Sequence, residues 1–490
     1  MNLKSAKLFF VIAAFFTLLQ LPFLFNHRQL FWDESVYLAM GKYIYSGGAS
    51  GLWEMIRPPG LPIVLGGIWK LGIPYAFFSE LVATGFGVGC IALTFFLARK
   101  LFNEGVAIIA AAFLATSPAF FYHSSSVLTE IPSAFFALAA ISLFISKKYY
   151  TSGALAAVAM LFKFPHALLI IVIAAAVFFS RQKLSPAAKA AISFVVVAAP
   201  FLAFNYLVYR RYVGSAFDAL FRPFLLGAWH QYNPAKAISG MLYSYSFYVI
   251  ELLRQNLAFI LMLPAAFLFV KKKWFTDSSK LLLAIFLVAY FAYFSYIPNK
   301  DGRFLLLFLP AVCILSAAAF VELLSYFKVR FRHIAVFAAA ALLMLSFYPA
   351  LLEDFSFYKW RSPAEPPIVS ELYMSLSQLG ITGPVLTSDP VFAYYNDNLF
   401  FHYYDSSKGI PKSITPSNEW ERDIPVEAVI YSPKSFYCPA GDLACGAAKL
   451  RLYNIIQSSY MQVFNVTYSD GISYYVFVNS STHSITGSNQ

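Results

Sequence analysis

The chain has 490 residues, of which 59% are hydrophobic, 19% aromatic and only 12% charged. This charged share is about half of that in ordinary soluble proteins, too little to cover the surface of a soluble globule. Apolar runs of about 20 residues follow one another from Lys7 to Leu352, and each is long enough to cross a bilayer. The composition therefore excludes a soluble protein and predicts a polytopic α-helical membrane protein.

The net charge of +12 does not indicate a nucleic-acid-binding protein, because the basic residues lie in short clusters between apolar runs. The positive-inside rule places such clusters in the cytoplasm, together with the N-terminus. The first apolar run lacks a small-residue cleavage site, so we interpret it as a retained span. The basic clusters are Lys4/Lys7, Arg99/Lys100, Lys147/Lys148, Arg181/Lys183, Lys271–Lys273 and Lys328/Arg330/Arg332.

We expect about eleven to thirteen spans. Eleven can be placed near residues 7–25, 76–98, 105–122, 127–146, 151–163, 165–180, 187–209, 246–270, 279–297, 303–326 and 333–351. An odd number puts the following chain outside, provided that Pro59 to Ile73, a short segment rich in Gly and Pro, does not cross. The pair 151–163 and 165–180 is short, and a hairpin of shallow helices broken at Pro165 is the alternative.

From residue 353 the composition changes to Ser, Asn, Asp, Pro and Tyr, with no apolar run long enough to span. We therefore predict a transmembrane domain over residues 1–352 and an external soluble domain over residues 353–490. The second domain is expected to be a small α/β or α+β module. Its predicted elements are strands at Pro384 and Glu427, helices over 368–379 and 444–458, and a closing hairpin around Asp470. Cys438 and Cys445 are close enough in sequence to form a disulfide outside the cell.

The first external loop contains Asp33 and Glu34, followed by an amphipathic pattern with Val36 and Met40 on one helical face. This pattern predicts an interfacial helix, with Asp33 as its N-cap and Glu34 favoured by the helix dipole. A carboxylate at the water–bilayer boundary beside aromatic residues such as Tyr37 also suits a general base. The two roles are compatible.

Several other charged residues fall on the predicted outer face. Arg57 is followed by two prolines that stiffen the chain, and its alternative role is a lipid-headgroup anchor. Glu130 opens a span, where a carboxylate is costly without a partner or a task, and its alternative role is a structural ion pair. Lys163 lies outside against the positive-inside bias, and its alternative role is snorkelling to lipid headgroups. His166 is interpreted as a hydrogen-bonded surface histidine.

The loop between residues 210 and 246 mixes cations with rings, a combination that suits a phosphate and a sugar. Its members are Arg210, Arg211, Arg222, Trp229, His230 and Tyr232. A last cluster, Lys300, Asp301 and Arg303, lies at the outer end of a span, and surface ion contacts are its alternative role. Several external basic loops beside two acidic sites predict a pocket for an anionic, membrane-embedded ligand.

These residues, in this order, resemble the membrane glycosyltransferases of the C-type fold that use polyprenyl-phosphate sugars, and more narrowly the protein O-mannosyltransferase and lipid A aminoarabinose transferase group. The resemblance covers residues 1–350 and implies that Asp33 is the catalytic carboxylate. The Trp-Trp-Asp-Tyr-Gly run of the oligosaccharyltransferase branch is missing. The matching elements are Asp33-Glu34 with Tyr37, Arg57-Pro58-Pro59, Glu130-x-Pro132, Lys163-x-Pro165, and Arg303-Phe304 with Pro310.

The expected enzyme transfers one hexose or pentose from an external polyprenyl or dolichyl monophosphate, such as dolichyl phosphate mannose, to a hydroxyl of a protein, lipid or glycan. Asp33 acts as the base, and attack opposite the phosphate inverts the anomeric centre. Glu34 and Glu130 are the other candidate catalytic carboxylates. The residues expected to contact the sugar are Tyr37, Trp229 and His230, and those expected to bind the phosphate are Arg57, Lys163, Arg210, Arg211, Lys300 and Arg303.

The expected partners are this donor, the acceptor and membrane lipids, with no nucleic acid. No cofactor is required, although a divalent metal bridging Asp33, Glu130 and the phosphate is compatible with the chemistry. The alternative function is a transporter or flippase for a lipid-linked sugar. The acidic residues gather on one predicted face rather than across the membrane, and this placement favours the enzyme.

The orientation can be tested with single cysteines at Ser185 and Ser215, which flank the span near 187–209. An impermeant thiol reagent applied to intact cells should label Ser215→Cys and leave Ser185→Cys unlabelled, because only residue 215 is expected outside. The unsubstituted chain, which has four cysteines, gives the background labelling. The reverse pattern would overturn the orientation.

Overall fold

The structure is a computed structural model whose contacts divide the chain into two units. The helical unit comprises Met1–His27, Ala76–Ala203 and Gly227–Ser362, and the sheet unit comprises Arg28–Tyr75, Phe204–Leu226 and Pro363–Gln490. The predicted boundary between residues 352 and 353 stays a prediction. The structure describes residues 3–25, 30, 32–210, 213–232, 241–271, 273–330, 348, 351–353, 356, 379–387, 389–405, 410–411, 426–432, 443–467 and 473–479.

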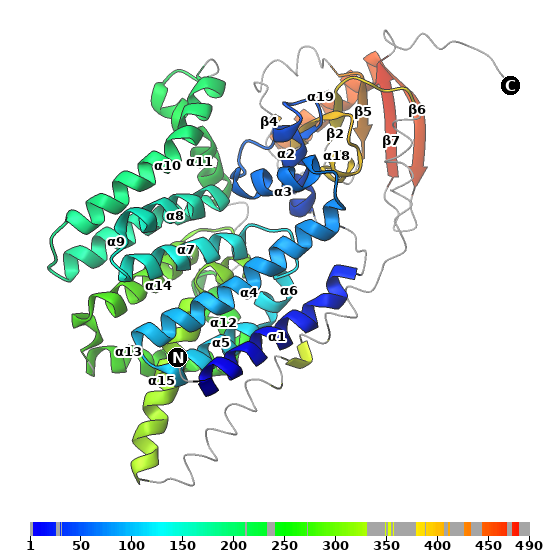
Figure 1. The fold of residues 1–490 in the computed structure, drawn as a ribbon. Helices are drawn as coiled ribbons and strands as arrows, with labels where there is room; N and C mark the ends of the chain where they lie inside the picture. Colours follow the sequence, from blue (N-terminus) through cyan, green and yellow to red (C-terminus); the bar gives the residue numbers. More distant parts are fainter. Residues whose placement is uncertain are drawn as a thin grey trace. The chain divides into compact units, whose positions relative to one another are not determined.

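Apolar helices build the helical unit (Figure 1), and two of them, α10 and α11, continue into the sheet unit. The short 3-10 turns η1 (Phe164–Ala167), η3 (Leu257–Leu261) and η5 (Gly302–Leu307) connect or precede several of them. The helices are α1 (Leu3–Phe25), α4 (Tyr75–Leu101), α5 (Glu104–Ala115), α6 (Pro118–His123), α7 (Glu130–Ile145), α8 (Tyr149–Phe162), α9 (Leu168–Phe179), α10 (Ser185–Tyr209), α11 (Ala216–Tyr232), α12 (Met241–Gln255), α13 (Met262–Lys271), α14 (Ser278–Tyr296) and α15 (Leu309–Arg330).

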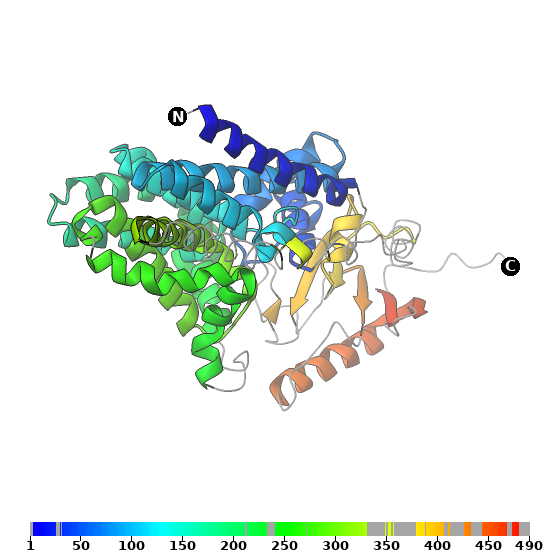
Figure 2. The ribbon, with the colours of Figure 1, turned by 90° about the horizontal axis from the view of Figure 1, so that it is seen from below.

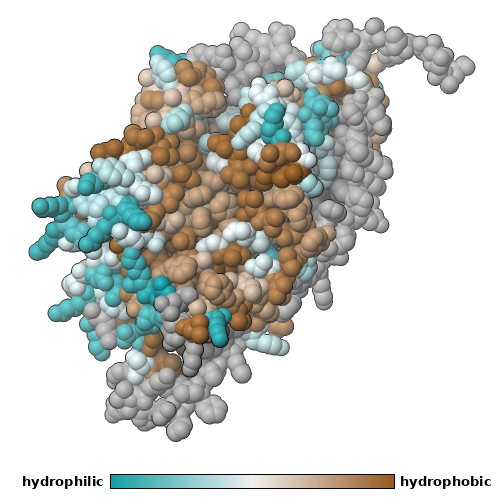
Figure 3. Space-filling model, viewed as in Figure 1, coloured by the Kyte–Doolittle hydropathy of each residue, from teal (hydrophilic) through white to brown (hydrophobic). Residues whose placement is uncertain are grey.

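Within the described residues, four helices are long and apolar enough to cross a membrane: Ser5–Phe25, Tyr75–Leu101, Ser185–Tyr209 and Ser278–Tyr296. They coincide with four predicted spans. Hydrophobic side chains also cover much of the visible surface of this unit (Figure 3). A multi-pass membrane protein is therefore confirmed, whereas the number of spans stays a prediction. The span predicted over 333–351 falls almost entirely outside the described residues.

Some predicted spans are interrupted where the sequence contains helix-starting residues. The predicted span 105–122 divides at Ser117, because Pro118 occupies the first turn of a new helix. The predicted span 246–270 divides at Asn256, whose side chain accepts a hydrogen bond from the Ala258 N–H. The break predicted at Pro165 is present, since η1 separates α8 from α9. These kinks shorten the regular helices below the length of the apolar runs.

The sheet unit is built on a mixed sheet of seven strands in the order β1-β3-β2-β5-β7-β6, with β4 paired to β3. Neighbours from β1 to β5 are parallel, whereas β7 is antiparallel to both β5 and β6. The strands predicted at Pro384 and Glu427, the helix over 444–458 and the closing hairpin are confirmed; the helix predicted over 368–379 lies almost wholly outside the described residues. The strands are β1 (Gly51–Leu52), β2 (Val385–Thr387), β3 (Phe400–Asp405), β4 (Ile410–Pro411), β5 (Ala428–Tyr431), β6 (Tyr460–Thr467) and β7 (Ser473–Asn479).

Helices cover both faces of this sheet. On one face, α2 (Trp32–Tyr45) and α18 (Val391–Tyr395) pack over Val385, Ile430 and Val476. On the other, α19 (Leu443–Ser459) packs over neighbours one residue out of phase, such as Val429 and Phe477 (Figure 2). This alternation follows from the two-residue period of a strand. It makes the unit a three-layer α/β arrangement.

The helix predicted after Asp33 is present as α2, and protein rather than lipid covers its apolar face, whereas its position at the membrane interface stays a prediction. Nine of its residues are buried, and its apolar side chains Val36 and Met40 belong to the core over the sheet. Helical periodicity identifies an apolar face without specifying whether lipid or protein covers it. The segment Pro59 to Ile73 contains α3 (Gly60–Lys70), about 16 Å long at 1.5 Å per residue, so it is too short to span, as predicted.

The segment before Arg57 is fixed by an unexpected strand, β1. Gly51 pairs with Phe400 and Leu52 with Phe401, so the loop after α2 becomes part of the sheet. Gly51 has φ +80°, and a Cβ there would lie 2.1 Å from the Ala39 carbonyl oxygen, so only glycine fits. This contact holds the chain that leads to Glu54 and Arg57 against α2.

Lys42, on α2, is a buried cation within the sheet unit. Its Nζ lies 2.6 Å from Asp397 Oδ1 and donates to the carbonyls of Tyr394 and Asn396 at the end of α18. Burial lowers the pKa of Lys42, and the ion pair with Asp397 partly offsets that effect. A cation is favourable at a helix C-terminus, where carbonyls lack helical partners. Lys42 therefore joins α2 to α18.

Candidate active site

In the sheet unit, Arg57 is the centre of a network that we call the Asp33 network. Its Nη2 donates to Asp33 Oδ1 at 2.6 Å, its Nε to Glu54 Oε2 at 3.0 Å and its Nη1 to the Tyr37 hydroxyl at 3.4 Å. The guanidinium carbon also lies 5.4 Å from the centre of the Tyr37 ring. Although burial disfavours the charged form, the carboxylates of Asp33 and Glu54 raise the pKa of Arg57 well above its usual value.

Local structure brings these side chains together. Asp33 lies in the first turn of α2 rather than before it, so the N-cap role is not what the structure shows, although the helix dipole still favours its charge. The Arg57 N–H donates to the Glu54 carbonyl at 3.1 Å, forming a turn that places both side chains on one side. Tyr37 follows Asp33 by one helical turn, so it lies on the same face.

The carboxylates of the Asp33 network differ in their exposure to solvent. The Asp33 side chain is 21% exposed and the Arg57 side chain 20%, whereas Glu54 is fully buried. Glu34, predicted as another catalytic carboxylate, is also fully buried. Asp33 is therefore the carboxylate that a substrate can reach in this network.

In the helical unit, a second set of charges forms what we call the Glu130 network. Glu130, in the first turn of α7, accepts a hydrogen bond from Lys163 Nζ at 2.6 Å, and both side chains are largely buried. Lys163 Nζ also lies 5.0 Å from the centre of the Phe304 ring. The ion pair offered as the alternative role of Glu130 is thus present, and it accounts for a carboxylate in an apolar helix.

Two further cations lie in the Glu130 network. Arg303 donates to Asp301 Oδ2 through Nε at 2.9 Å and Nη2 at 2.7 Å. Burial opposes ionisation of Asp301, but Arg303 and, more weakly, Lys163 outweigh it and lower its pKa, so the two ion pairs act on each other. Lys300 donates to the Phe294 and Ser295 carbonyls at the end of α14, and burial lowers its pKa to about 8.

The prediction of His166 as a surface residue is wrong. Its side chain is fully buried, and its Nδ1 lies 2.7 Å from the Tyr290 hydroxyl. The 3-10 turn η1, which begins just before Pro165, turns the ring inward beneath Lys163, whose carbonyl accepts from the His166 N–H. The prediction that His166 is hydrogen-bonded is therefore confirmed, whereas the prediction that it is exposed is not.

The structure describes only some of the remaining predicted site residues. Arg210 is exposed and donates through Nη1 to the Val213 carbonyl at 3.0 Å. Arg211 lies outside the described residues, as does Cys438 with its predicted disulfide. Trp229 and His230 lie on α11, but their side chains are outside the described part.

Sequence reasoning missed Glu54. The spacing of Glu54 and Arg57, three residues apart and directly after an apolar strand, was the available signal. In the described part of the chain, no group of three or more His, Cys, Asp or Glu side chains is arranged to hold a metal ion. The bridging divalent metal considered from the sequence stays a prediction.

Comparisons with known proteins show a family and a fold to which this chain is similar. Residues 57–206 match the sequence family described as dolichyl-phosphate-mannose-protein mannosyltransferase. No curated protein sequence matches the chain. Among solved structures, ArnT from Cupriavidus metallidurans bound to undecaprenyl phosphate has a TM-score of 0.63 at 14% identity, covering 100% of both chains.

The oligosaccharyltransferase from Archaeoglobus fulgidus is also similar. Tethered with an acceptor peptide containing the NVT sequon, it gives a TM-score of 0.62 at 13% identity, covering 98% of this chain and 74% of that one. In complex with an inhibitory peptide and a dolichol-phosphate, it gives 0.59 at 12% identity, covering 98% and 75%. These matches confirm the predicted resemblance, the C-type fold and the prediction of a glycosyltransferase.

The Glu130–Lys163 pair allows a test that separates stability from function. Lys163→Met leaves a buried carboxylate without its partner, so it should lower the free energy of unfolding by about 3–5 kcal/mol. Adding Glu130→Gln removes that carboxylate charge and should restore most of the loss. Thermal unfolding and turnover of purified Lys163→Met, Glu130→Gln and the double variant measure the two effects.

If the pair only holds the helices together, the double variant recovers turnover along with stability. If it also contacts the substrate, stability returns and turnover does not. Additive destabilisation by the two substitutions would contradict the coupling.

Proposed function

We propose that this protein transfers a single sugar from a polyprenyl or dolichyl monophosphate to an acceptor hydroxyl. Asp33 removes the acceptor proton while the acceptor oxygen forms a bond to the anomeric carbon. The bond from that carbon to the phosphate oxygen breaks, and polyprenyl phosphate leaves with the electron pair. Attack from the side opposite the phosphate inverts the anomeric centre. The structures of ArnT with undecaprenyl phosphate and of the Archaeoglobus fulgidus oligosaccharyltransferase with a dolichol-phosphate support this type of donor.

The observation that carries this proposal is the difference between the two carboxylates on Arg57. Asp33 is partly exposed and Glu54 is fully buried, although each accepts a short bond from the same guanidinium. A base must reach the proton that it removes, and of these two carboxylates the exposure of Asp33 supports that role. Glu54 instead holds Arg57, which in turn orients Asp33.

The proposal assigns Arg57 a positioning role. Nε, Nη1 and Nη2 each donate to a side chain of the protein, so most of the guanidinium is committed before substrate binds. The carboxylates of Asp33 and Glu54 both lie against this guanidinium and offset part of its charge, which weakens its attraction for a phosphate. The phosphate role predicted for Arg57 is therefore the alternative that kinetics must exclude.

The departing phosphate is assigned to cations of the Glu130 network. Lys163, Lys300 and Arg303 bring three cations to this network, beside the carboxylates of Glu130 and Asp301. Preorganised cations stabilise charge that develops on a leaving group, by several kcal/mol in low-dielectric sites. Catalysis by this route does not require a metal, and the sugar contacts predicted for Tyr37, Trp229 and His230 remain part of the proposal.

The proposed orientation places the N-terminus in the cytoplasm and both networks on the outer side of the membrane. It follows from two basic clusters, Arg99/Lys100 in the last turn of α4 and Lys147/Lys148 just after the end of α7. A protein, lipid or glycan acceptor would then be met outside. The acceptor peptide in the archaeal oligosaccharyltransferase structure supports an external acceptor of the protein class.

The role of Asp33 is tested with Asp33→Asn. The amide keeps the size of the side chain, so folding should change little, whereas turnover should fall by about 10² or more because the general base is lost. The assay measures polyprenyl phosphate released by purified protein from a lipid-phosphate sugar with protein, lipid and glycan acceptors. Asp218→Asn is the matched control, since Asp218 is 32% exposed and also pairs with an arginine, Arg222, at 3.1 Å. Normal turnover in Asp33→Asn would refute the assignment.

The role of Arg57 is tested with Arg57→Lys. An ammonium cannot reproduce three divergent hydrogen bonds, so Asp33 should lose its orientation, and kcat should fall about tenfold or more with little change in KM for the donor. Arg222→Lys is the matched control. A raised donor KM at unchanged kcat would assign Arg57 to ground-state phosphate binding, and unchanged kinetics would leave it as a headgroup anchor.

A further inference from the structure

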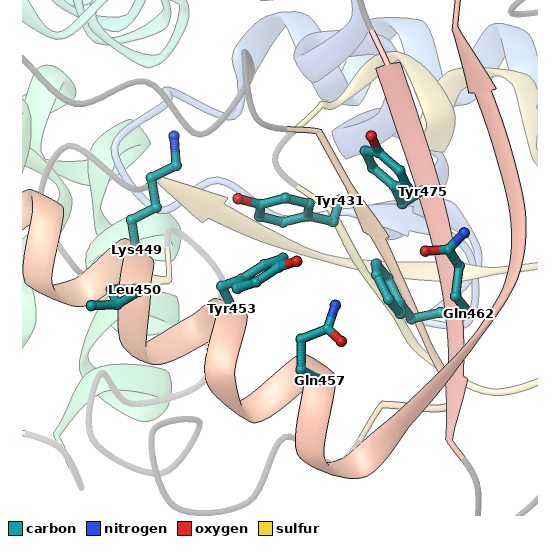
Figure 4. A pocket seen from close by; sticks show the side chains of 8 residues that line it. Tyr431, Lys449, Leu450, Tyr453, Gln457, Gln462 and Tyr475 are labelled. Carbon is teal, nitrogen blue, oxygen red and sulfur yellow. The ribbon is translucent and has the colours of Figure 1, made fainter.

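A pocket of about 510 Å³ lies in the sheet unit between α19 and the strands β5, β6 and β7 (Figure 4). None of the residues that line it belongs to the Asp33 network or the Glu130 network. Its volume falls in the range of pockets that bind small molecules. The pocket therefore requires an explanation independent of sugar transfer.

Aromatic rings form its walls. Tyr431 from β5 and Tyr453 from α19 have ring centres 5.6 Å apart with planes inclined at 46°, and Tyr475 and Phe477 follow on β7. In Figure 4 the rings of Tyr431 and Tyr453 lie close together, with Tyr475 further along the sheet. Burial, and to a lesser extent the neighbouring phenols of Tyr453 and Tyr475, raise the pKa of Tyr431.

Polar groups are distributed around these rings. The amides of Gln457 and Gln462 come from α19 and β6, and each carries donors and an acceptor. Lys449, one helical turn before Tyr453, adds an ammonium donor. The phenol oxygens add further donors and acceptors. The lining therefore combines apolar ring faces with polar groups that can both donate and accept hydrogen bonds.

This combination selects among ligand classes. An acyl chain has no groups that could form hydrogen bonds with two amides. A charged peptide or a nucleotide would require more than one cation. A pyranose ring presents C–H groups on its faces and hydroxyls, each both donor and acceptor, around its edge. We propose that this pocket binds a pyranose ring of a carbohydrate, with Tyr453 against the ring face and Gln457 and Gln462 bonded to hydroxyls.

The full chain, purified in a sugar-free detergent such as an alkyl amine oxide, is the sample for the test, because maltoside headgroups would occupy the same pocket. The probes are methyl β-glucopyranoside, methyl α-mannopyranoside and methyl β-N-acetylglucosaminide, without donor or acceptor. Saturation-transfer NMR should show transfer from protein to at least one of them, strongest at the C–H groups of one ring face.

Two substitutions should weaken this binding. Tyr453→Ala removes a stacking wall and should raise the Kd about tenfold, which corresponds to about 1.4 kcal/mol. Gln457→Ala removes an amide and should raise it about threefold. Both positions are exposed on α19 and alanine favours a helix, so the fold should be kept, as thermal unfolding can verify. Tyr395→Ala is the matched control, because Tyr395 is 37% exposed and Tyr453 39%, and it lies outside the pocket.

Absence of saturation transfer to all three glycosides at tens of millimolar would overturn the proposal. It would also be overturned if Tyr453→Ala and Gln457→Ala bound as tightly as Tyr395→Ala, since the sugar would then occupy another site. Because no donor is present, either result leaves the proposed transfer reaction untouched, and loss of transfer in Asp33→Asn leaves this pocket untouched.

Discussion

Charges buried in the sheet unit must be paired, and this requirement fixes the position of α2. Lys42 and Asp33 are nine residues apart, about two and a half helical turns, so they point to opposite sides of the helix. Lys42 binds Asp397 and the end of α18, whereas Asp33 binds Arg57. Because an unpaired buried charge costs several kcal/mol, rotation of α2 in either direction is resisted by one pair or the other. The orientation of Asp33 is thus a consequence of packing in the whole unit.

The proposed reaction makes different chemical demands on the two networks. A base gains from a site that does not neutralise it, and Glu54 opposes part of the field of Arg57 at Asp33. A leaving phosphate gains from preorganised cations, the role proposed for Lys163, Lys300 and Arg303. If all cations surrounded one carboxylate, they would stabilise its ionised form and weaken it as a base. In the proposed reaction, the leaving phosphate and the base therefore use different cations.

Local sequence patterns predicted the parts of the fold that depend on local physics. Apolar length identified α1, α4, α10 and α14, and strand composition identified β2 and β5. Asp33 and Arg57 were both identified, but their pairing was not, because hydrogen bonds between a helix and a distant loop leave no periodic signal. Gly51 illustrates the same limit: its pairing with Phe400 joins segments far apart in sequence, and no local preference specifies the partner of a parallel strand.

The sheet also separates the two proposed sites within one unit. Ile430 faces the core under α2, and the next residue, Tyr431, faces the pocket under α19. Along β7, Val476 and Tyr475 divide in the same way. Because neighbouring side chains of a strand point to opposite faces, changes to the pocket wall do not remove core contacts that support Asp33. The proposed sugar-binding pocket can therefore vary in specificity while the position of the base stays constant.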